Sequence, residues 1–118
     1  MSDKYKEIVK EIDASFAKNE MEGFFKHCAE NIEWKMVGDK TTKGLEAIRE
    51  WMASMPEGEP PKINARNIIV EGDSVAAYGN MTMKNENGEN VVYDYCDVYQ
   101  FENNKIIELN SFVIKTDK

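Results

Sequence analysis

One acidic residue stands within a row of aromatic residues. Asp97 lies in a strand-like segment whose alternate positions carry Tyr93, Tyr95, Tyr99 and Phe101. Because strand side chains alternate between two faces, these five residues share one face. If this face points inward, desolvation raises the pKa of the Asp97 carboxyl. A neutral Asp97 could donate a hydrogen bond to a ligand oxygen, and an ionised Asp97 could act as a base. The alternative is a structural carboxylate, hydrogen-bonded to a tyrosine hydroxyl or an asparagine.

The other candidate site residues are adaptable apolar side chains. Trp34 and Met36 share one face of an expected strand, and Trp51 and Met55 lie on an expected helix. Tryptophan and methionine form adaptable apolar walls. The alternative is an ordinary core without a void. The residues predicted to line a ligand pocket are Trp34, Met36, Trp51, Met55, Tyr95 and Tyr99.

Histidine and cysteine are sparse in this sequence. It has one histidine, His27, and two cysteines, Cys28 and Cys96. No pair of these residues has metal-ligand spacing, so we expect no metal site and no cofactor. His27 lies beside the apolar positions of an expected helix and is interpreted as a packing residue rather than a catalytic one. Both cysteines are interpreted as small core residues of a protein in a reducing compartment.

Composition and charge disfavour several classes of partner. The chain of 118 residues is 42% apolar and 31% charged, which is typical of one folded domain covering residues 1–118. Its net charge is −7 and its only arginines are Arg49 and Arg66. Nucleic acids and anionic membrane surfaces attract clustered Lys and Arg, so neither is an expected partner. No apolar run approaches the roughly 20 residues of a membrane span, and the charged N-terminus lacks the apolar segment of a signal peptide. The expected location is therefore cytoplasmic.

Three helices are expected in the first half of the chain. Apolar residues recur at helical spacing over about residues 3–18 and again over residues 45–55. Between these helices, Asn19 and Glu22 have the spacing of a capping box. This box predicts a second, shorter helix whose apolar face runs over residues 21–28.

The strands are expected mainly in the second half. Residues 32–37 alternate between apolar and charged and predict a first strand. A polar loop is expected after it, over residues 38–44. Asn87-Gly88 is the strongest hairpin signal in the chain. Strands linked by short turns form an antiparallel meander, and three amphipathic helices must cover it, so the expected fold class is α+β. The four later strands are predicted at residues 62–71, 74–84, 89–102 and 105–115.

Five short motifs follow one another in a recognisable order. They are Asn19-Glu20-Met21-Glu22-Gly23, Ala29-Glu30-Asn31-Ile32-Glu33-Trp34, Gly44-Leu45-Glu46-Ala47-Ile48-Arg49-Glu50-Trp51, Asp97-Val98-Tyr99-Gln100-Phe101 and Lys105-Ile106-Ile107-Glu108. With this order the chain resembles the SnoaL-like and ketosteroid-isomerase-like branch of the nuclear-transport-factor-two-like superfamily. The resemblance implies a cone-shaped curved antiparallel sheet, a cystatin-like α+β barrel, closed by three helices in the N-terminal half. It also implies a small apolar molecule inside the cone and a homodimer formed through the sheet.

The resemblance places catalytic groups at particular positions. In ketosteroid isomerases, a tyrosine on the first helix and a protonated aspartate on a late strand hold the enolate oxygen, and a second aspartate moves the proton. The late-strand aspartate corresponds to Asp97, whereas the tyrosine falls near Ile12 and the second aspartate near Met36. The acid of SnoaL-like polyketide cyclases falls near Ser111. Asp97 is therefore the one predicted catalytic residue.

Two functions remain open at this stage. The first is binding of a small, mostly apolar molecule in the cone, with cofactor-free acid-base chemistry of the isomerase, cyclase or dehydratase type. The second is a non-catalytic homodimeric module that binds a ligand or a protein. An open cavity with Asp97 at its base would favour the first function, and a sealed, fully packed cone would favour the second.

Overall fold

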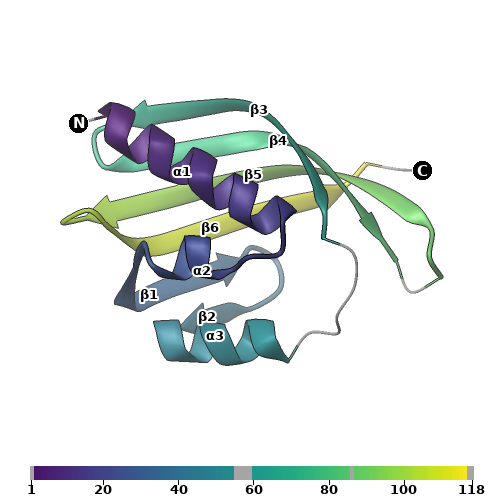
Figure 1. The fold of residues 1–118 in the computed structure, drawn as a ribbon, viewed down its shortest axis with the longest axis horizontal. Coiled ribbons are helices and arrows are strands. Elements are labelled where there is room, and N and C mark those ends of the chain that lie inside the picture. The colour runs from purple at the N-terminus through teal and green to yellow at the C-terminus, as the bar shows by residue number, and fades with distance from the viewer. Residues whose placement is uncertain (1, 55–59, 86, 117–118) are drawn as a thin grey trace.

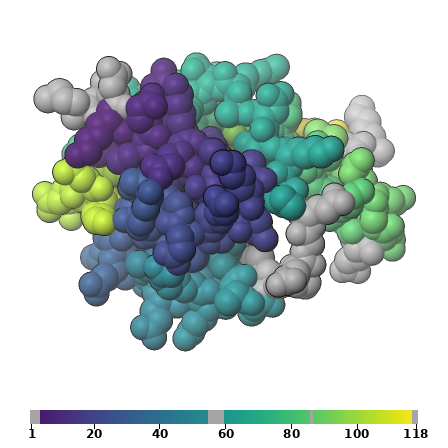
Figure 2. All heavy atoms as spheres, viewed as in Figure 1, coloured from purple at the N-terminus to yellow at the C-terminus, as the bar shows by residue number. Residues whose placement is uncertain are grey.

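In the part of the chain that the structure describes, three helices cover one face of a curved sheet of six strands (Figure 1). The computed structural model describes residues 2–54, 60–85 and 87–116. A space-filling view from the same side shows the helices packed in front of the sheet (Figure 2). The elements in chain order are α1 Ser2–Ala17, α2 Glu22–Phe25, β1 Cys28–Met36, β2 Thr41–Lys43, α3 Leu45–Ala53, β3 Lys62–Glu71, β4 Ser74–Lys84, β5 Asn90–Glu102 and β6 Lys105–Lys115.

The strands β3 to β6 form the predicted antiparallel meander. Each begins and ends within one residue of its expected range. The strand order across the sheet is β2-β1-β6-β5-β4-β3. Gly88 turns the chain between β4 and β5 with a φ of 78°, a left-handed conformation that glycine adopts without strain. The α+β class and the helix-covered sheet are therefore confirmed.

One strand pairing differs from the expectation of a wholly antiparallel sheet. β1 lies parallel to β6, with Trp34 opposite Leu109 and Met36 opposite Ser111. Strands joined by a tight turn must run antiparallel, but most of the chain separates β1 from β6, so no turn dictates their relative direction. This parallel pairing places the first strand beside the last strand, and β6 separates β1 from β5.

The junction between α1 and α2 is not the predicted capping box. Asn19 adopts a φ of 59°, and the backbone N–H groups of Asn19 and Glu20 donate to the carbonyls of Phe16 and Ser15. These two bonds form a Schellman motif, so Asn19 ends α1 instead of starting α2. No side chain caps α2, which begins after Met21. Asparagine tolerates the left-handed conformation, which explains why it fits at this position.

Two further expectations about the first half were wrong. Residues 38–44 are not only a polar loop, because they contain the edge strand β2, in which buried Thr42 pairs with Trp34. Cys28 does not lie on a helix but begins β1, although it is buried as expected. Neither residues 38–44 nor the start of β1 at Cys28 shows a strand pattern in the local sequence. Pairing with distant strands therefore decides the structure at both places.

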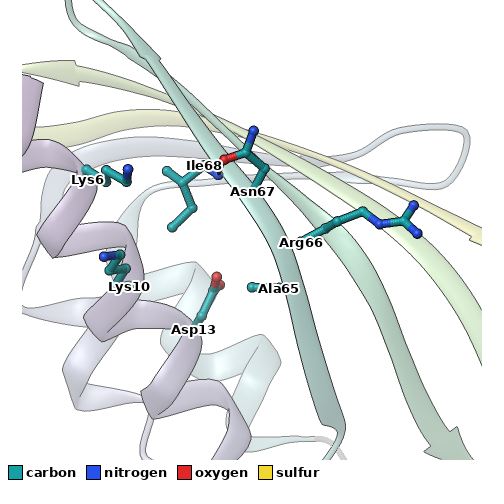
Figure 3. A pocket seen from close by; sticks show the side chains of 7 residues that line it. All are labelled: Lys6, Lys10, Asp13, Ala65, Arg66, Asn67 and Ile68. Carbon is teal, nitrogen blue, oxygen red and sulfur yellow. Dashed lines mark hydrogen bonds between the residues drawn. The ribbon is translucent and has the colours of Figure 1, made fainter.

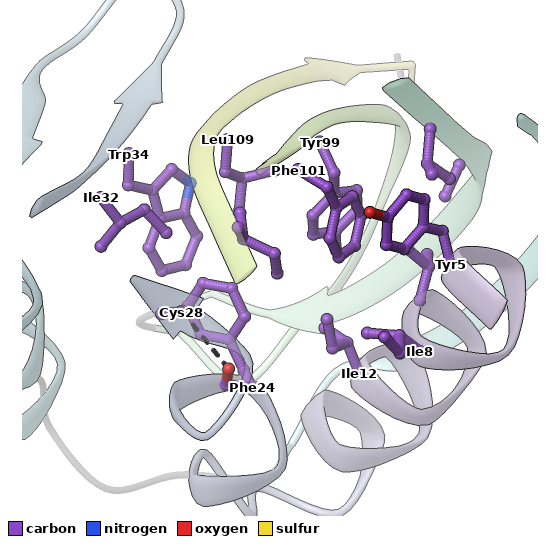
Figure 4. Packing of buried hydrophobic residues seen from close by; sticks show 14 of the residues in the cluster. Tyr5, Ile8, Ile12, Phe24, Cys28, Ile32, Trp34, Tyr99, Phe101 and Leu109 are labelled. Atoms are coloured by element: carbon purple, nitrogen blue, oxygen red, sulfur yellow. Dashed lines mark hydrogen bonds between the residues drawn. The ribbon is translucent and has the colours of Figure 1, made fainter. Parts of the chain in front are cut away.

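The core lies between the helices and the inner face of the sheet (Figure 4). α1 contributes the apolar positions that its spacing predicted, and Tyr5 stacks on Phe101 of β5 with ring centroids 4.1 Å apart. On the other side of the core, Phe24 of α2 packs edge-on against Trp34 at 5.3 Å. The fully buried large side chains include Tyr99, Phe24, Phe101, Ile12, Ile32, Ile48, Ile106 and Leu109.

Candidate functional site

A row of five side chains crosses the inner face of the sheet at Asp97. The register pairs Asp97 with Ser111 of β6 on one side and with Ala77 of β4 on the other. Ser111 in turn lies opposite Met36 of β1, and Ala77 lies opposite Ile68 of β3. The neighbouring rows place Tyr99 and Tyr95 on either side of Asp97 along β5. The predicted face of β5 therefore points toward the helices and not into bulk water.

The Asp97 carboxyl is partly buried and has a strongly altered ionisation. Desolvation raises the pKa of Asp97 to about 7. A hydrogen bond from Ser111 lowers this pKa, but by less than desolvation raises it. The negative charge of Asp13 raises this pKa further. Asp97 thus changes protonation near neutral pH, where a general acid or base is most effective.

Tyr95 and Tyr99 flank Asp97 with hydroxyl groups that have no partner among the described residues. The side chains are only 6% and 0% exposed, and both hydroxyl oxygens are buried. Burial, together with the charges of Asp13 and Asp97, raises the pKa of each phenol well above its usual value. Two neutral hydroxyl groups without a partner in a buried site can hydrogen-bond a water molecule or a ligand oxygen.

Trp34 connects Asp97 to an aromatic wall that Trp34 forms with Trp51. Its indole Nε1–H donates to Ser111 Oγ at 2.9 Å, and the Ser111 hydroxyl donates to Asp97. The ring of Trp34 meets Trp51 edge-on at 5.3 Å. Trp34 and Tyr99 are thus core residues, while Met36 and Trp51 are partly buried against that core. Met55, the sixth predicted lining residue, lies outside the described residues.

The structure adds Asp13, which the sequence analysis overlooked. An acidic residue in a helix rich in charged residues is expected on the solvated side, yet the Asp13 side chain is only 8% exposed and its Oδ2 has no partner within the described chain. Burial raises the pKa of Asp13 to about 6. The missed signal is spacing: Asp13 follows Val9 by four residues and precedes Phe16 by three, which places it on the apolar face.

A cleft of about 300 Å³ lies between α1 and β3 and includes Asp13 among its lining residues. Lys6, Lys10 and Asp13 lie on the side of α1 that faces β3, whereas Arg66 extends away from the helix (Figure 3). The remaining lining residues are Ala65, Asn67 and Ile68. Asp97 is not among the described residues that line this cleft.

A bulge in β3 shapes one wall of the cleft. The register shifts between Ala65 and Asn67, which leaves Arg66 unpaired in the strand. Gly79 of β4 lies against this bulge, and a Cβ atom there would collide with the backbone of Asn64 and Arg66. The glycine, which is the residue of β4 that pairs with Tyr95, therefore permits the close approach of β3.

The remaining candidates lie away from this cluster. His27 Nε2 is 3.2 Å from Glu11 Oε1 on the outer side of α1, which agrees with a packing role. Cys28 is buried, and burial raises the pKa of its thiol to about 12. Within residues 2–54, 60–85 and 87–116, no group of three or more His, Cys, Asp and Glu could hold a metal ion. No helix in these ranges is long and apolar enough to cross a membrane.

Several proteins of known structure share this fold. An NTF2-like protein from Cytophaga hutchinsonii is 22% identical, with a TM-score of 0.75 over 91% of this chain and 96% of its own. A candidate SnoaL-like polyketide cyclase from Jannaschia sp. CCS1 is 17% identical, with a TM-score of 0.79 over 91% and 83%. A candidate ketosteroid isomerase from Kribbella flavida is 10% identical, with a TM-score of 0.80 over 99% and 82%. At these identities the likeness establishes the NTF2-like cone fold.

The family follows from the sequence match. The SnoaL-like domain family matches residues 9–109, which is most of the chain. The chain therefore belongs to the SnoaL-like domain family. No curated protein matches it in sequence.

Proposed function

We propose that the protein binds a small, mostly apolar molecule inside the cone and that Asp97 exchanges a proton with it. The observation that carries this proposal is the position of Asp97 between Tyr95 and Tyr99 on β5, because both tyrosine hydroxyls are buried and lack partners among the described residues. Leaving such hydroxyls unpaired costs about 1–3 kcal/mol each, and a ligand oxygen would remove that cost. The structural relatives named as a cyclase and an isomerase are compatible with this chemistry.

The surroundings of Asp97 indicate what the ligand looks like. Trp34, Trp51 and Met36 offer an apolar, mainly aromatic wall. The polar groups near it are those of Asp97, its partner Ser111 and the two tyrosines beside Asp97. Such a site favours a ligand with an apolar body and one or two oxygen atoms. A reaction of the isomerase, cyclase or dehydratase type needs only proton transfer at these oxygens and adjacent carbons, for which a carboxyl group near neutral pKa is suited.

We expect 2-naphthol to bind more tightly than naphthalene. Both have the same apolar body, but only 2-naphthol has a hydroxyl that can bond to Asp97 or Tyr99. A hydrogen bond of this kind contributes roughly 0.5–1.5 kcal/mol, so the affinity ratio should be about 2- to 10-fold. Chemical-shift titration of the ¹⁵N-labelled protein measures both affinities and locates the binding site.

The Asp97→Asn variant serves as the comparison for this experiment. It should reduce the preference for 2-naphthol over naphthalene while leaving naphthalene binding unchanged. Equal affinities of the wild-type protein for the two compounds, or shifts confined to residues outside the cone, would contradict the proposal.

The second candidate, a homodimeric binding module, is supported by the outer face of the sheet. Five large apolar side chains are exposed there or at its margin: Val37, Ile69, Val92, Phe112 and Ile114. In the register, Ile114 lies opposite Asp94 and Phe112 opposite Cys96, all on the face that the helices leave uncovered. Exposed apolar patches of this kind mark interaction surfaces. We propose that a second copy of the chain covers this patch, with or without catalysis in the cone.

Ile114→Glu should convert the dimer into a monomer. Ile114 is 64% exposed, so a charge at this position costs little in the monomer but would be buried without a partner in the interface. Sedimentation velocity gives the mass of each species. Ala14→Glu on the exposed side of α1 is the matched control and should leave the dimer intact. A wild-type protein that sediments as a monomer at all accessible concentrations would contradict this arrangement.

A further inference from the structure

The cleft between α1 and β3 differs in its lining from the site around Asp97. Its described lining residues all belong to α1 and β3, and its volume is about 300 Å³. The groups around Asp97 come instead from β1, β5 and β6. A volume of this size is at the lower end of the range for small-molecule sites. The cleft is therefore a candidate second binding site.

One buried group in the cleft lacks a partner. The Asp13 side chain is 8% exposed, and its Oδ2 has no hydrogen-bond partner among the described residues. Figure 3 shows its carboxyl group directed from α1 toward Ala65 of β3. A buried carboxylate oxygen without a donor is costly, so a ligand that donates a hydrogen bond to it removes that cost. The cleft therefore favours a ligand with an O–H or N–H group beside Asp13.

The solvent side of the cleft is positively charged. Lys6 and Lys10 lie one helical turn apart on the same side of α1 as Asp13 (Figure 3). Lys6 makes no ion pair within the described chain, and Lys10 pairs only with exposed Glu7, at 3.5 Å. An exposed pair of this kind is weak, so both ammonium groups are available to an anion. A cationic ligand would be repelled by them, whereas a carboxylate would be attracted.

The wall opposite the lysines is apolar. Ile68 points from β3 toward α1, and Ala65 lies on the same strand nearer to Asp13 (Figure 3). The Ile68 N–H donates to the Asn67 side chain at 2.9 Å, which holds the strand at this wall. Arg66 extends away from α1, so its charge does not face the lysines. An apolar ligand body therefore fits between this wall and the helix.

We propose that the cleft between α1 and β3 is a second binding site, which takes a small hydroxy acid with an apolar body. The ligand carboxylate contacts Lys6 and Lys10, the ligand hydroxyl donates to Asp13 Oδ2, and the apolar body lies against Ile68. A plain carboxylate would leave Asp13 without a partner, and a plain alcohol would leave the lysines without an anion. This ligand class differs from the mostly apolar molecule proposed for the cone, and the inference does not depend on that function.

4-Hydroxybenzoate, benzoate and phenol test the two polar contacts separately. At about pH 7.5 Asp13 is ionised, because burial raises its pKa only to about 6. 4-Hydroxybenzoate should bind about tenfold more tightly than benzoate, which lacks the donor for Asp13. It should bind about 2- to 10-fold more tightly than phenol, which lacks the anion, and added salt should reduce this second ratio. Chemical-shift titration of the ¹⁵N-labelled protein measures the affinities and should move the amide signals of residues 6–13 and 65–68.

Two substitutions assign the contacts to their residues. Asp13→Ala should abolish the preference for 4-hydroxybenzoate over benzoate, and α1 should still form because alanine favours helix. Asp13→Asn, which keeps the shape of the side chain, should give a smaller change in the same direction if the alanine variant does not fold. Lys10→Gln should reduce the preference over phenol. Lys4→Gln, also on α1 but not among the residues that line the cleft, is the matched control and should leave both ratios unchanged.

Three results would overturn the inference. They are equal affinities for 4-hydroxybenzoate and benzoate, a preference that survives in Asp13→Ala, and shifts confined to the residues around Asp97. The proposed function of the cone is judged separately, because 2-naphthol binding there is followed at the residues around Asp97.

Discussion

At pH 8 the Asp97→Asn variant is expected to be more stable than the wild-type protein. The pKa of Asp97 is raised from 3.8 to about 7 in the folded state, so the folded protein binds this proton more tightly than the unfolded chain. The wild-type free energy of unfolding therefore declines as the pH rises from about 4 to 7. The full pKa shift corresponds to a loss of at most about 4 kcal/mol in the free energy of unfolding. The asparagine amide stays neutral, so the variant does not lose this stability as the pH rises.

Urea unfolding at several pH values measures this difference. Near pH 3 the carboxyl is mostly protonated in both states, so the two proteins should differ by little more than the cost of exchanging an acid for an amide. The gap should widen from about pH 4 and level off above pH 7. Asp73→Asn, in the exposed turn between β3 and β4, is the matched control and should follow the wild-type curve. A constant gap between Asp97→Asn and wild type across this range would show that Asp97 is not desolvated.

Trp34→Ala is expected to be the most destabilising aromatic substitution at the site, by about 3–5 kcal/mol. The Trp34 side chain is 8% exposed and packs against Phe24 and Trp51, with ring centroids 5.3 Å away in each case. Its removal leaves a cavity and also leaves Ser111 Oγ, buried in β6, without its indole donor. Guanidinium unfolding compares the free energies.

Trp51→Ala is the matched control for this substitution. Trp51 also lies in the aromatic wall but is only partly buried, and its exposed side contacts the Lys40 ammonium at 5.2 Å. Its loss should therefore cost clearly less than the loss of Trp34. Equal costs, or a cost below about 1 kcal/mol for Trp34→Ala, would mean that Trp34 does not anchor the wall.

The second half of the fold was predictable because its signals are local. Alternation and turn residues specify β3 to β6 almost to the residue, and the same alternation correctly places Tyr95, Asp97 and Tyr99 on the inner face. The parallel pairing of β1 with β6 and the short strand β2 depend on contacts between distant segments, for which no local pattern exists.

The sequence predicted Asp97 as a site residue but not Asp13. Asp97 is conspicuous because aromatic residues alternate with it along the chain, whereas Asp13 is one of several charged residues in the first helix. The helical spacing places Asp13 on the apolar face of α1, and the packing of α1 on β3 and β4 buries it. The relay from Trp34 through Ser111 to Asp97 likewise joins three strands and requires the parallel register of β1.

These features share one energetic pattern. The tyrosine hydroxyls without described partners and the two desolvated carboxyl groups all cost the folded protein stability. Polar groups arranged in this way are typical of a functional site, where stability is reduced in favour of ligand binding or catalysis.

The ionisation of the Asp97 carboxyl tests the proposed site most directly. A partly buried carboxyl on the inner face of β5, beside Tyr95 and Tyr99, must resist losing its proton. In the wild-type protein the ¹³C signal of the Asp97 carboxyl should titrate with a midpoint near the pKa of about 7 that desolvation gives it. A midpoint near 4, the value of a carboxyl in water, would place Asp97 in solvent and contradict the proposed site.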